Sequence, residues 1–239
     1  MGLYRDTAVV LRTHKLGEAD RVVVLLGRAT GKVRAVAKGV RRTGSKFGSR
    51  LEPGSYVSVQ LHKGRGELDI VTQAETVESF RRTREDLSRL GRAASLLEAV
   101  EQLAQDRQPA PRLHDMLVGG LRAIDDRNPP LVAGAFFLKL LAVEGVAPEL
   151  DSCVGCGEED GDMWMALEAG GLRCRSCGGG RPVSDEALAV SRAVLGGGLN
   201  AALDLPEGNV THEVESLATA ALESHLERRL RSLHVLHDG

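Results

Sequence analysis

The four cysteines of the chain form two close pairs whose spacing is typical of a metal site. Cys153 and Cys156 make one C-x-x-C pair, Cys174 and Cys177 make the other, and 17 residues separate the two pairs. A glycine follows each pair, which lets the backbone turn so that its amides face the thiolates. Four thiolates at this spacing suit a closed tetrahedral zinc site. The sequence therefore predicts one structural zinc ion on Cys153, Cys156, Cys174 and Cys177.

Other chemistry for the same cysteines stays open at this point. An iron–sulfur cluster uses the same ligands, although such clusters usually show tighter or three-plus-one spacing. Two disulfides do not suit a cytoplasmic protein. A four-cysteine site leaves no coordination position for water or substrate, so we expect a structural and not a catalytic metal. The segment around the cysteines is polar, and we expect it to need the metal in order to fold.

The second chemical feature is a cationic stretch near the amino end. Nine Lys or Arg residues and no acid lie between Asp20 and Glu52, in a strand that enters a Gly- and Ser-rich loop. Cationic loops of this kind can follow a phosphate backbone and give salt-sensitive, sequence-tolerant binding. We expect DNA contacts from the residues at the strand end and on the loop, which are Arg34, Lys38, Arg41, Arg42, Lys46 and Arg50.

Phe47 is the one aromatic residue inside the cationic stretch. It either stacks on a base of bound nucleic acid or anchors the loop against the protein. General burial preferences favour the anchor.

The net charge of −2 is an average over two unlike halves. Residues 1–80 hold 14 Lys and Arg against 8 Asp and Glu, a balance of +6, whereas residues 81–239 hold 17 against 25, a balance of −8. A basic module joined to an acidic one indicates a polyanionic partner for the first half. The alternative is ordinary variation between two halves of a chain.

The elements that would position these groups differ between the two halves. Short segments rich in Val, Leu and Ile, punctuated by glycine, predict strands at 8–12, 21–26, 32–37, 56–62 and 67–76. Five short strands in this length fit a closed barrel of the OB type, with an open five-stranded sheet as the rival. The segment 63–66 is typical of a hairpin turn.

From residue 82 onward, apolar residues recur at helical spacing. This pattern predicts helices near 87–100, 112–124 and 131–144, with others after 184 and 211, and a loop-like segment at 150–182. The predicted fold class is α+β. We expect residues 1–80 to form a basic OB-fold DNA-binding domain and residues 81–239 to form a helical domain, into which the zinc-binding loop 150–182 is inserted.

Several classes of function lack their sequence motifs. Residues 27–32 give G-x-x-x-G-K, but the spacing is wrong for a phosphate-binding loop and Val33 stands where Ser or Thr is required. The sequence contains no G-x-S-x-G, H-E-x-x-H or paired-carboxylate signature, so we expect no enzymatic activity. It shows neither a membrane-spanning segment nor a signal peptide, so we expect a cytoplasmic location.

Four groups of residues together resemble the bacterial RecO family of recombination mediators. The first two are the opening strand Tyr4–Arg12 and the turn Gly17-Glu18-Ala19-Asp20-Arg21. The third is Lys38-Gly39-Val40-Arg41-Arg42, followed by Phe47 and by Leu51-Glu52-Pro53-Gly54. The fourth joins the helical part to the cysteines, from Phe137-Leu138-Lys139-Leu140-Leu141 through Gly145, Pro148 and Leu150-Asp151 to Cys153-x-x-Cys156-Gly157. These matches occur in order along the chain.

The resemblance implies an N-terminal OB barrel, a helical domain and a zinc-finger-like insertion. It also implies binding of single- and double-stranded DNA, annealing of complementary strands and cooperation with RecR. The expected outcome is loading of RecA onto gapped DNA coated with single-strand-binding protein. Two rivals remain: a zinc-ribbon protein-interaction module without direct DNA binding, and a zinc-dependent nuclease, which would need an open metal site or clustered carboxylates.

Overall fold

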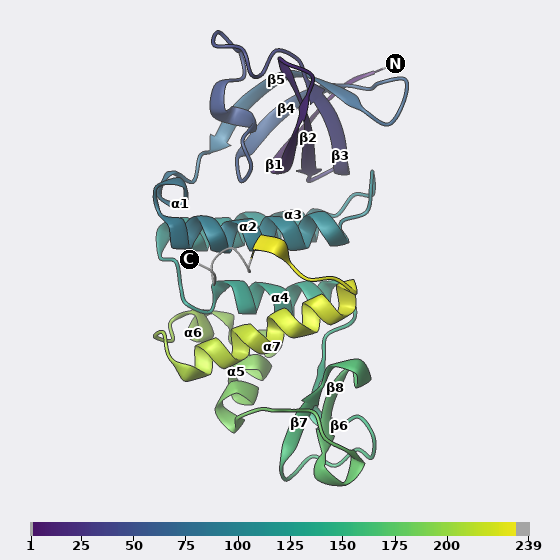
Figure 1. The fold of residues 1–239 in the computed structure, drawn as a ribbon, viewed down its shortest axis with the longest axis vertical. Helices are drawn as coiled ribbons and strands as arrows, with labels where there is room; N and C mark the ends of the chain where they lie inside the picture. Colours follow the sequence, from purple (N-terminus) through teal and green to yellow (C-terminus); the bar gives the residue numbers. More distant parts are fainter. Residues whose placement is uncertain (1, 233–239) are drawn as a thin grey trace. The chain divides into compact units, whose positions relative to one another are not determined.

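The computed structural model describes residues 2–232, which form two compact units. The first unit extends to Asp126, and the second covers Arg127–Arg231. Figure 1 shows the elements in chain order. The first unit therefore groups the barrel with the first helices, while a boundary between sequence modules at residue 80 stays a prediction.

A closed five-stranded barrel opens the first unit. Its neighbours are ordered β1-β2-β3-β5-β4, and every pair is antiparallel except β3 with β5. This is the OB-type barrel predicted from the sequence, and the open sheet is excluded. The strands are β1 (Leu3–Leu16), β2 (Asp20–Gly27), β3 (Gly31–Ala37), β4 (Tyr56–His62) and β5 (Asp69–Glu78).

Alternating side chains give the barrel its core. In β4, Val57, Val59 and Leu61 are buried while the residues between them are partly exposed. The first strand is longer than predicted because it serves two neighbours. Its first half pairs with β4 and its second half with β2, with an irregularity between Val10 and Arg12. Pairing partners far away in sequence therefore extend this strand beyond its apolar centre.

Phe47 closes one side of the barrel together with a short 3-10 helix, η1 (Gly48–Leu51). Phe47 and Leu51 are each 1% exposed and belong to the barrel core. The anchoring role favoured for Phe47 is therefore confirmed, and its ring is not available to stack on a base.

Three helices complete the first unit: α1 (Arg81–Glu85), α2 (Leu87–Leu103) and α3 (Pro111–Asp126). Asp86 caps α2 by accepting a hydrogen bond from the backbone nitrogen of Arg89 at 2.9 Å. Both α2 and α3 contact β1, and α3 also contacts β2. Outward-facing Val9 and Leu26 are fully buried on this side of the barrel.

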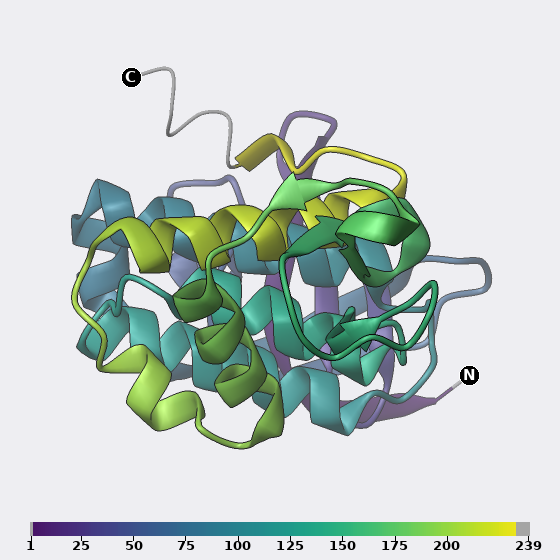
Figure 2. The same cartoon turned by 90° about the horizontal axis from the view of Figure 1, so that it is seen from below.

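The helical core of the second unit consists of four helices. These are α4 (Val132–Val143), α5 (Asp185–Gly196), α6 (Leu199–Leu203) and α7 (Asn209–Leu226). Helix α4 packs against α7, drawn yellow-green in Figure 2, and α5 packs against both. A Cβ atom on Gly134 would lie 2.9 Å from the Cα atom of Glu215, so α4 and α7 approach this closely only because residue 134 is glycine.

The cysteine segment is a small sheet, and the prediction of a loop there was wrong. Its strands β6 (Glu149–Cys153), β7 (Met163–Ala166), β8 (Gly171–Cys174) and β9 (Arg181–Pro182) are ordered β6-β8-β7-β9. Leu150, Met165 and Leu172 are buried and pack with Leu188 of α5 and Leu217 of α7. Strands of two to five residues are too short to show a periodic pattern in the sequence.

Candidate nucleic-acid interface and metal centre

The nine cations between Asp20 and Glu52 fall into two groups once the chain is folded. Three of them meet carboxylates from other segments. Arg21 lies 2.7 Å from Glu52, Arg28 lies 2.9 Å from Asp115, and Lys32 lies 3.5 Å from Asp106. Their charge is therefore largely compensated within the protein.

The other six cations have no carboxylate partner among residues 2–232, and all six are exposed. They are the six predicted from the sequence as DNA contacts: Arg34, Lys38, Arg41, Arg42, Lys46 and Arg50. The hydrogen bonds found for this group go to backbone carbonyl oxygens, which leaves the positive charge uncompensated.

Strand direction places the loop cations at one end of the barrel. Because β1, β2 and β3 are antiparallel neighbours, the β1–β2 turn and the loop after β3 lie at the same end, and the β2–β3 turn lies at the other. Arg28 and Lys32 belong to the β2–β3 end, where their carboxylate partners come from α3 and from the segment between α2 and α3. The loop that follows β3 lies at the end of the barrel farther from these helices (Figure 1).

Hydrogen bonds attach the cationic loop to the barrel along its length. Arg41 donates to the carbonyl oxygens of Gly17 at 3.3 Å and Glu18 at 2.9 Å, both in the β1–β2 turn. Lys46 donates to the carbonyl oxygen of Thr72 in β5 at 2.9 Å, and its ammonium lies 5.0 Å from the centre of the Phe47 ring. The loop is therefore held in a defined conformation on this end of the barrel.

Two further basic residues were missed in the sequence. His14 and Lys15 are exposed at the end of β1 and pair with Val22 and Arg21 of β2. They lie beside the same turn as the cationic loop. They lie outside the acid-free run because Glu18 and Asp20 follow them in the chain, although strand pairing brings them to the same end of the barrel.

The four cysteines lie together as their spacing predicted. Their Sγ atoms are all within 4.8 Å of one another, and those of Cys156 and Cys174 are 3.6 Å apart. Four thiolates about 2.3 Å from a central zinc ion would have Sγ–Sγ separations of about 3.8 Å, which this arrangement fits. The sulfur of Cys153 also accepts hydrogen bonds from the backbone nitrogens of Cys174 at 3.3 Å and Gly155 at 3.4 Å.

The electrostatics of the four-cysteine cluster also favour a bound cation. The backbone N–H of Cys174 lowers the pKa of Cys153 to about 6, whereas hydrogen bonding to the Cys156 thiol raises the pKa of Cys177 to about 12. Four thiols this close therefore cannot all ionise unless a positive charge lies among them. A soft divalent metal ion supplies that charge, and the donor set can hold a metal ion.

Comparison with known proteins identifies the family. The family model for Recombination protein O N terminal matches residues 1–80, and the one for Recombination protein O C terminal matches residues 84–234. The chain belongs to the RecO family. It is 46% identical over 242 residues to the DNA repair protein RecO of Frankia casuarinae, covering 99% of each chain.

RecO family membership supports a role in DNA repair and recombination. The N-terminal RecO match contains the barrel and its cationic loop, and the C-terminal match contains the helices and the four cysteines. None of the helices between residues 2 and 232 combines the length and apolar character needed to cross a membrane.

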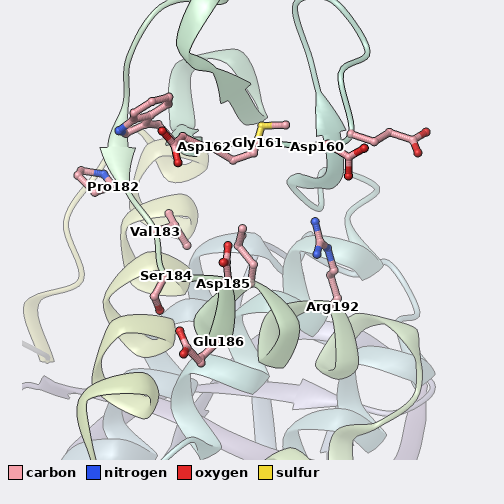
Figure 3. Close-up of a pocket in the computed structure, with 13 residues that line it drawn as sticks. Asp160, Gly161, Asp162, Pro182, Val183, Ser184, Asp185, Glu186 and Arg192 are labelled. Atoms are coloured by element: carbon pink, nitrogen blue, oxygen red, sulfur yellow. The ribbon is translucent and has the colours of Figure 1, made fainter.

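A second surface of this RecO-family chain has the opposite charge. A hollow of about 770 Å³ lies between the loop before β7 and the start of α5. Figure 3 shows Asp160 and Asp162 on one side of it, with Asp185 and Glu186 on the first turn of α5. Carboxylates repel phosphate, so this hollow is not a candidate for nucleic acid.

Proposed function

We propose that this RecO-family chain is a non-enzymatic recombination mediator that binds DNA through the cationic end of its barrel. The observation that carries the proposal is the set of six exposed cations without a carboxylate partner in residues 2–232. The proposed contacts are Arg34, Lys38, Arg41, Arg42, Lys46 and Arg50, extended by His14 and Lys15. Binding to phosphate explains why such a surface is left uncompensated.

The mode of binding follows from the residue types. Lysine and arginine contact phosphates and carry little sequence information, so the proposed surface accepts both single- and double-stranded DNA. Phe47 is buried, so we assign it no base stacking. Binding of this type weakens steeply with salt and depends little on sequence.

Strand annealing follows from the same electrostatics. A surface that neutralises phosphates lowers the repulsion between two complementary strands, so they pair without consumption of ATP. With RecR, the protein would then help RecA to replace single-strand-binding protein on gapped DNA in the cytoplasm. These partner roles rest on the family and on the DNA-binding surface.

Charge reversal tests the DNA-binding surface directly. A variant with Arg41→Glu, Arg42→Glu and Lys46→Glu should bind labelled oligonucleotides of unrelated sequence more weakly, all to a similar degree. The same variant should anneal complementary strands more slowly in the absence of ATP. Binding equal to that of the parent protein at low salt would refute the assigned surface, and degradation of the labelled DNA would instead support a nuclease.

The metal we propose is a single structural zinc ion. Cys153, Cys156, Cys174 and Cys177 would hold it, and zinc would supply a cross-link between the two C-x-x-C turns. Because all four positions are occupied by protein thiolates, no position remains for a catalytic water. Elemental analysis of the purified protein should give one zinc per chain, whereas iron with visible absorbance would indicate an iron–sulfur cluster instead.

A further inference from the structure

We infer that Asp20, an acidic residue at the DNA-binding end of the barrel, positions the cationic loop and thereby strengthens DNA binding. This inference rests on the proposed function of the loop and adds a residue that does not touch DNA. It makes an unusual prediction, because removal of a negative charge near a phosphate-binding surface ordinarily increases affinity.

The role of Asp20 follows from its contact with the start of the loop. Its Oδ1 atom accepts a hydrogen bond from the backbone nitrogen of Gly39 at 2.7 Å. Gly39 has a φ of +68°, a conformation that favours glycine, so the chain turns sharply at this point. Lys38 and Arg42 lie on either side of this turn, so the hydrogen bond to Asp20 sets where both cations point.

Neighbouring hydrogen bonds from Arg41 hold the same part of the loop to the β1–β2 turn. The backbone nitrogen of Arg41 donates to the carbonyl oxygen of Ala19 at 3.0 Å, and its guanidinium donates to two further carbonyl oxygens of that turn. Asp20 supplies the only side-chain acceptor of this attachment among the described residues. At the far end of the loop, the Arg21–Glu52 ion pair holds the chain to the start of β2.

Attachment of this kind lowers the cost of binding. A loop that is already ordered loses less conformational entropy when its side chains engage phosphates than a free loop does. Asp20 therefore favours binding by ordering the loop and opposes it by its charge. One hydrogen bond outweighs one partly screened charge here, because the acceptor fixes the loop while the charge acts through solvent.

Two substitutions at Asp20 separate these effects. Asp20→Asn and Asp20→Ala remove the same charge, but only asparagine keeps an oxygen that can accept from Gly39. We expect Asp20→Asn to bind single-stranded oligonucleotides at least as tightly as the parent protein. Asp20→Ala should bind about two- to ten-fold more weakly than Asp20→Asn, the range that corresponds to one net hydrogen bond. It should also bind more weakly than the parent protein, and tighter binding than the parent would overturn the inference.

Substitutions at two other acidic residues serve as controls. One tests the effect of removing a negative charge near the loop, and the other tests the effect of loosening the barrel. Glu18 lies on the same turn, and its carboxylate has no partner in the described chain, so Glu18→Ala should tighten binding. Asp6 accepts hydrogen bonds from Ala29 and Thr30 in the β2–β3 turn at the opposite end of the barrel. Asp6→Ala should lower thermal stability and leave the DNA affinity of the folded protein unchanged.

A DNA-free measurement keeps the inference separate from the proposed function. Trypsin should cut the loop after Arg41, Arg42 or Lys46 faster in Asp20→Ala than in Asp20→Asn, with both proteins folded by circular dichroism. If Asp20→Ala does not fold, Asp20→Ser replaces it. Serine keeps a polar side chain at this position, but its hydroxyl is too close to its own backbone to reach the Gly39 nitrogen.

The outcomes are separable. Failure of the parent protein to bind DNA at low salt would overturn the proposed function and leave the trypsin result as the test of loop positioning. Equal DNA affinity and equal loop cleavage for Asp20→Ala and Asp20→Asn would overturn the positioning role. A loss of affinity in Asp6→Ala as large as that in Asp20→Ala would also overturn it, since general loosening of the barrel would then explain both.

Discussion

Arg42 and Arg28 carry the same charge and are both exposed, but they differ in their surroundings. Arg28 makes a bidentate ion pair with Asp115 through its Nε and Nη2 atoms. Hydrogen bonds from Arg28 and His114 hold the pKa of Asp115 well below its usual range. The charge of Arg28 is therefore compensated by an ionised carboxylate at neutral pH. Arg42 has no such partner in the described chain.

These two arginines provide a matched test of phosphate contact. Arg42→Ala should reduce the slope of log affinity against log salt for single-stranded DNA by about 0.7, the value for one phosphate contact. Arg28→Ala removes the same charge and should leave the slope unchanged. Fluorescence anisotropy with a labelled oligonucleotide measures both, and equal slopes for the two variants would contradict the division into paired and unpaired cations.

Asp69 is the most buried ionisable group of the barrel. Its side chain is fully buried and accepts hydrogen bonds from Tyr4, from the Gly64 backbone and from Arg107. Burial acts to raise the pKa of Asp69, but the hydrogen bonds from Arg107, Tyr4 and Gly64 outweigh it and leave this pKa below its usual value. The ionised carboxylate therefore ties β1 and the β4–β5 turn to the segment between α2 and α3.

The sign of the pH effect follows from this lowered pKa. Asp69 binds a proton less readily in the folded state, so its contribution to stability is present above about pH 4 and is lost as the pH falls further. Asp69→Asn should lower the free energy of unfolding by about 1–3 kcal/mol at pH 7, with a smaller difference from the parent protein at pH 3.

Urea denaturation at pH 7 and pH 3 measures the free energy of unfolding of the parent protein and the variant. Asp126→Asn is the control, because Asp126 is 74% exposed and its ion pair with Arg82 lies at the surface, where such pairs contribute about 0–1 kcal/mol. An Asp69→Asn variant as stable as the parent protein at pH 7 would show that the buried network does not stabilise the barrel.

At the scale of elements, the cysteine sheet and the barrel should respond differently to loss of metal. Cys174 is buried at the end of β8, and its backbone nitrogen donates to Cys153. Cys174→Ser should therefore weaken binding of the proposed metal and loosen the sheet at 149–182, because its short strands would lose the cross-link between the two C-x-x-C turns. The barrel shares no residue with this cluster, so we expect salt-dependent DNA binding to persist.

Metal content and limited proteolysis of Cys174→Ser test this account. Cleavage within 149–182 should appear together with loss of the proposed zinc ion, whereas oligonucleotide binding should stay close to that of the parent protein. Loss of DNA binding in the folded variant would show that the metal module belongs to the DNA-binding surface and would contradict its purely structural role.

The elements that the sequence predicted best are those with a strong local pattern. The alternation of Val57, Val59 and Leu61 identified β4, and the apolar run at 131–144 identified α4. The sheet around the cysteines was missed because its strands are short and depend on packing against α5 and α7. The full length of β1 was missed because its polar ends are strands only through their pairing with β4 and β2.

Prediction of the candidate site from the sequence also succeeded for local patterns and failed for long-range contacts. The acid-free run identified the six cations between Asp20 and Glu52 that lack a carboxylate partner in residues 2–232, but not His14 and Lys15. The C-x-x-C spacing identified the cysteine cluster. The compensation of Arg28 by Asp115, 87 residues away, depends on how α3 packs against the barrel. No local pattern contains that information, and the same holds for the attachment of Gly39 to Asp20.

At the scale of the whole molecule, the net charge of −2 would not suggest a DNA-binding protein. Affinity for a polyanion depends on the local field of a surface more than on the total charge, because charges farther away than about 8–10 Å are screened by salt. The proposed binding of DNA by the basic barrel is therefore compatible with the balance of −8 in residues 81–239. The acidic hollow beside α5 adds to the contrast between the two surfaces.

A salt titration of binding between the intact protein and a single-stranded oligonucleotide is the decisive test of DNA binding by the cationic end of the barrel. Up to six phosphate contacts would give a slope of log affinity against log salt as steep as about −4, and simultaneous replacement of Lys38, Arg41, Arg42 and Lys46 by alanine should flatten it. Tight binding that does not change with salt, or no binding in dilute buffer, would contradict a DNA-gripping role for the cationic end of the barrel.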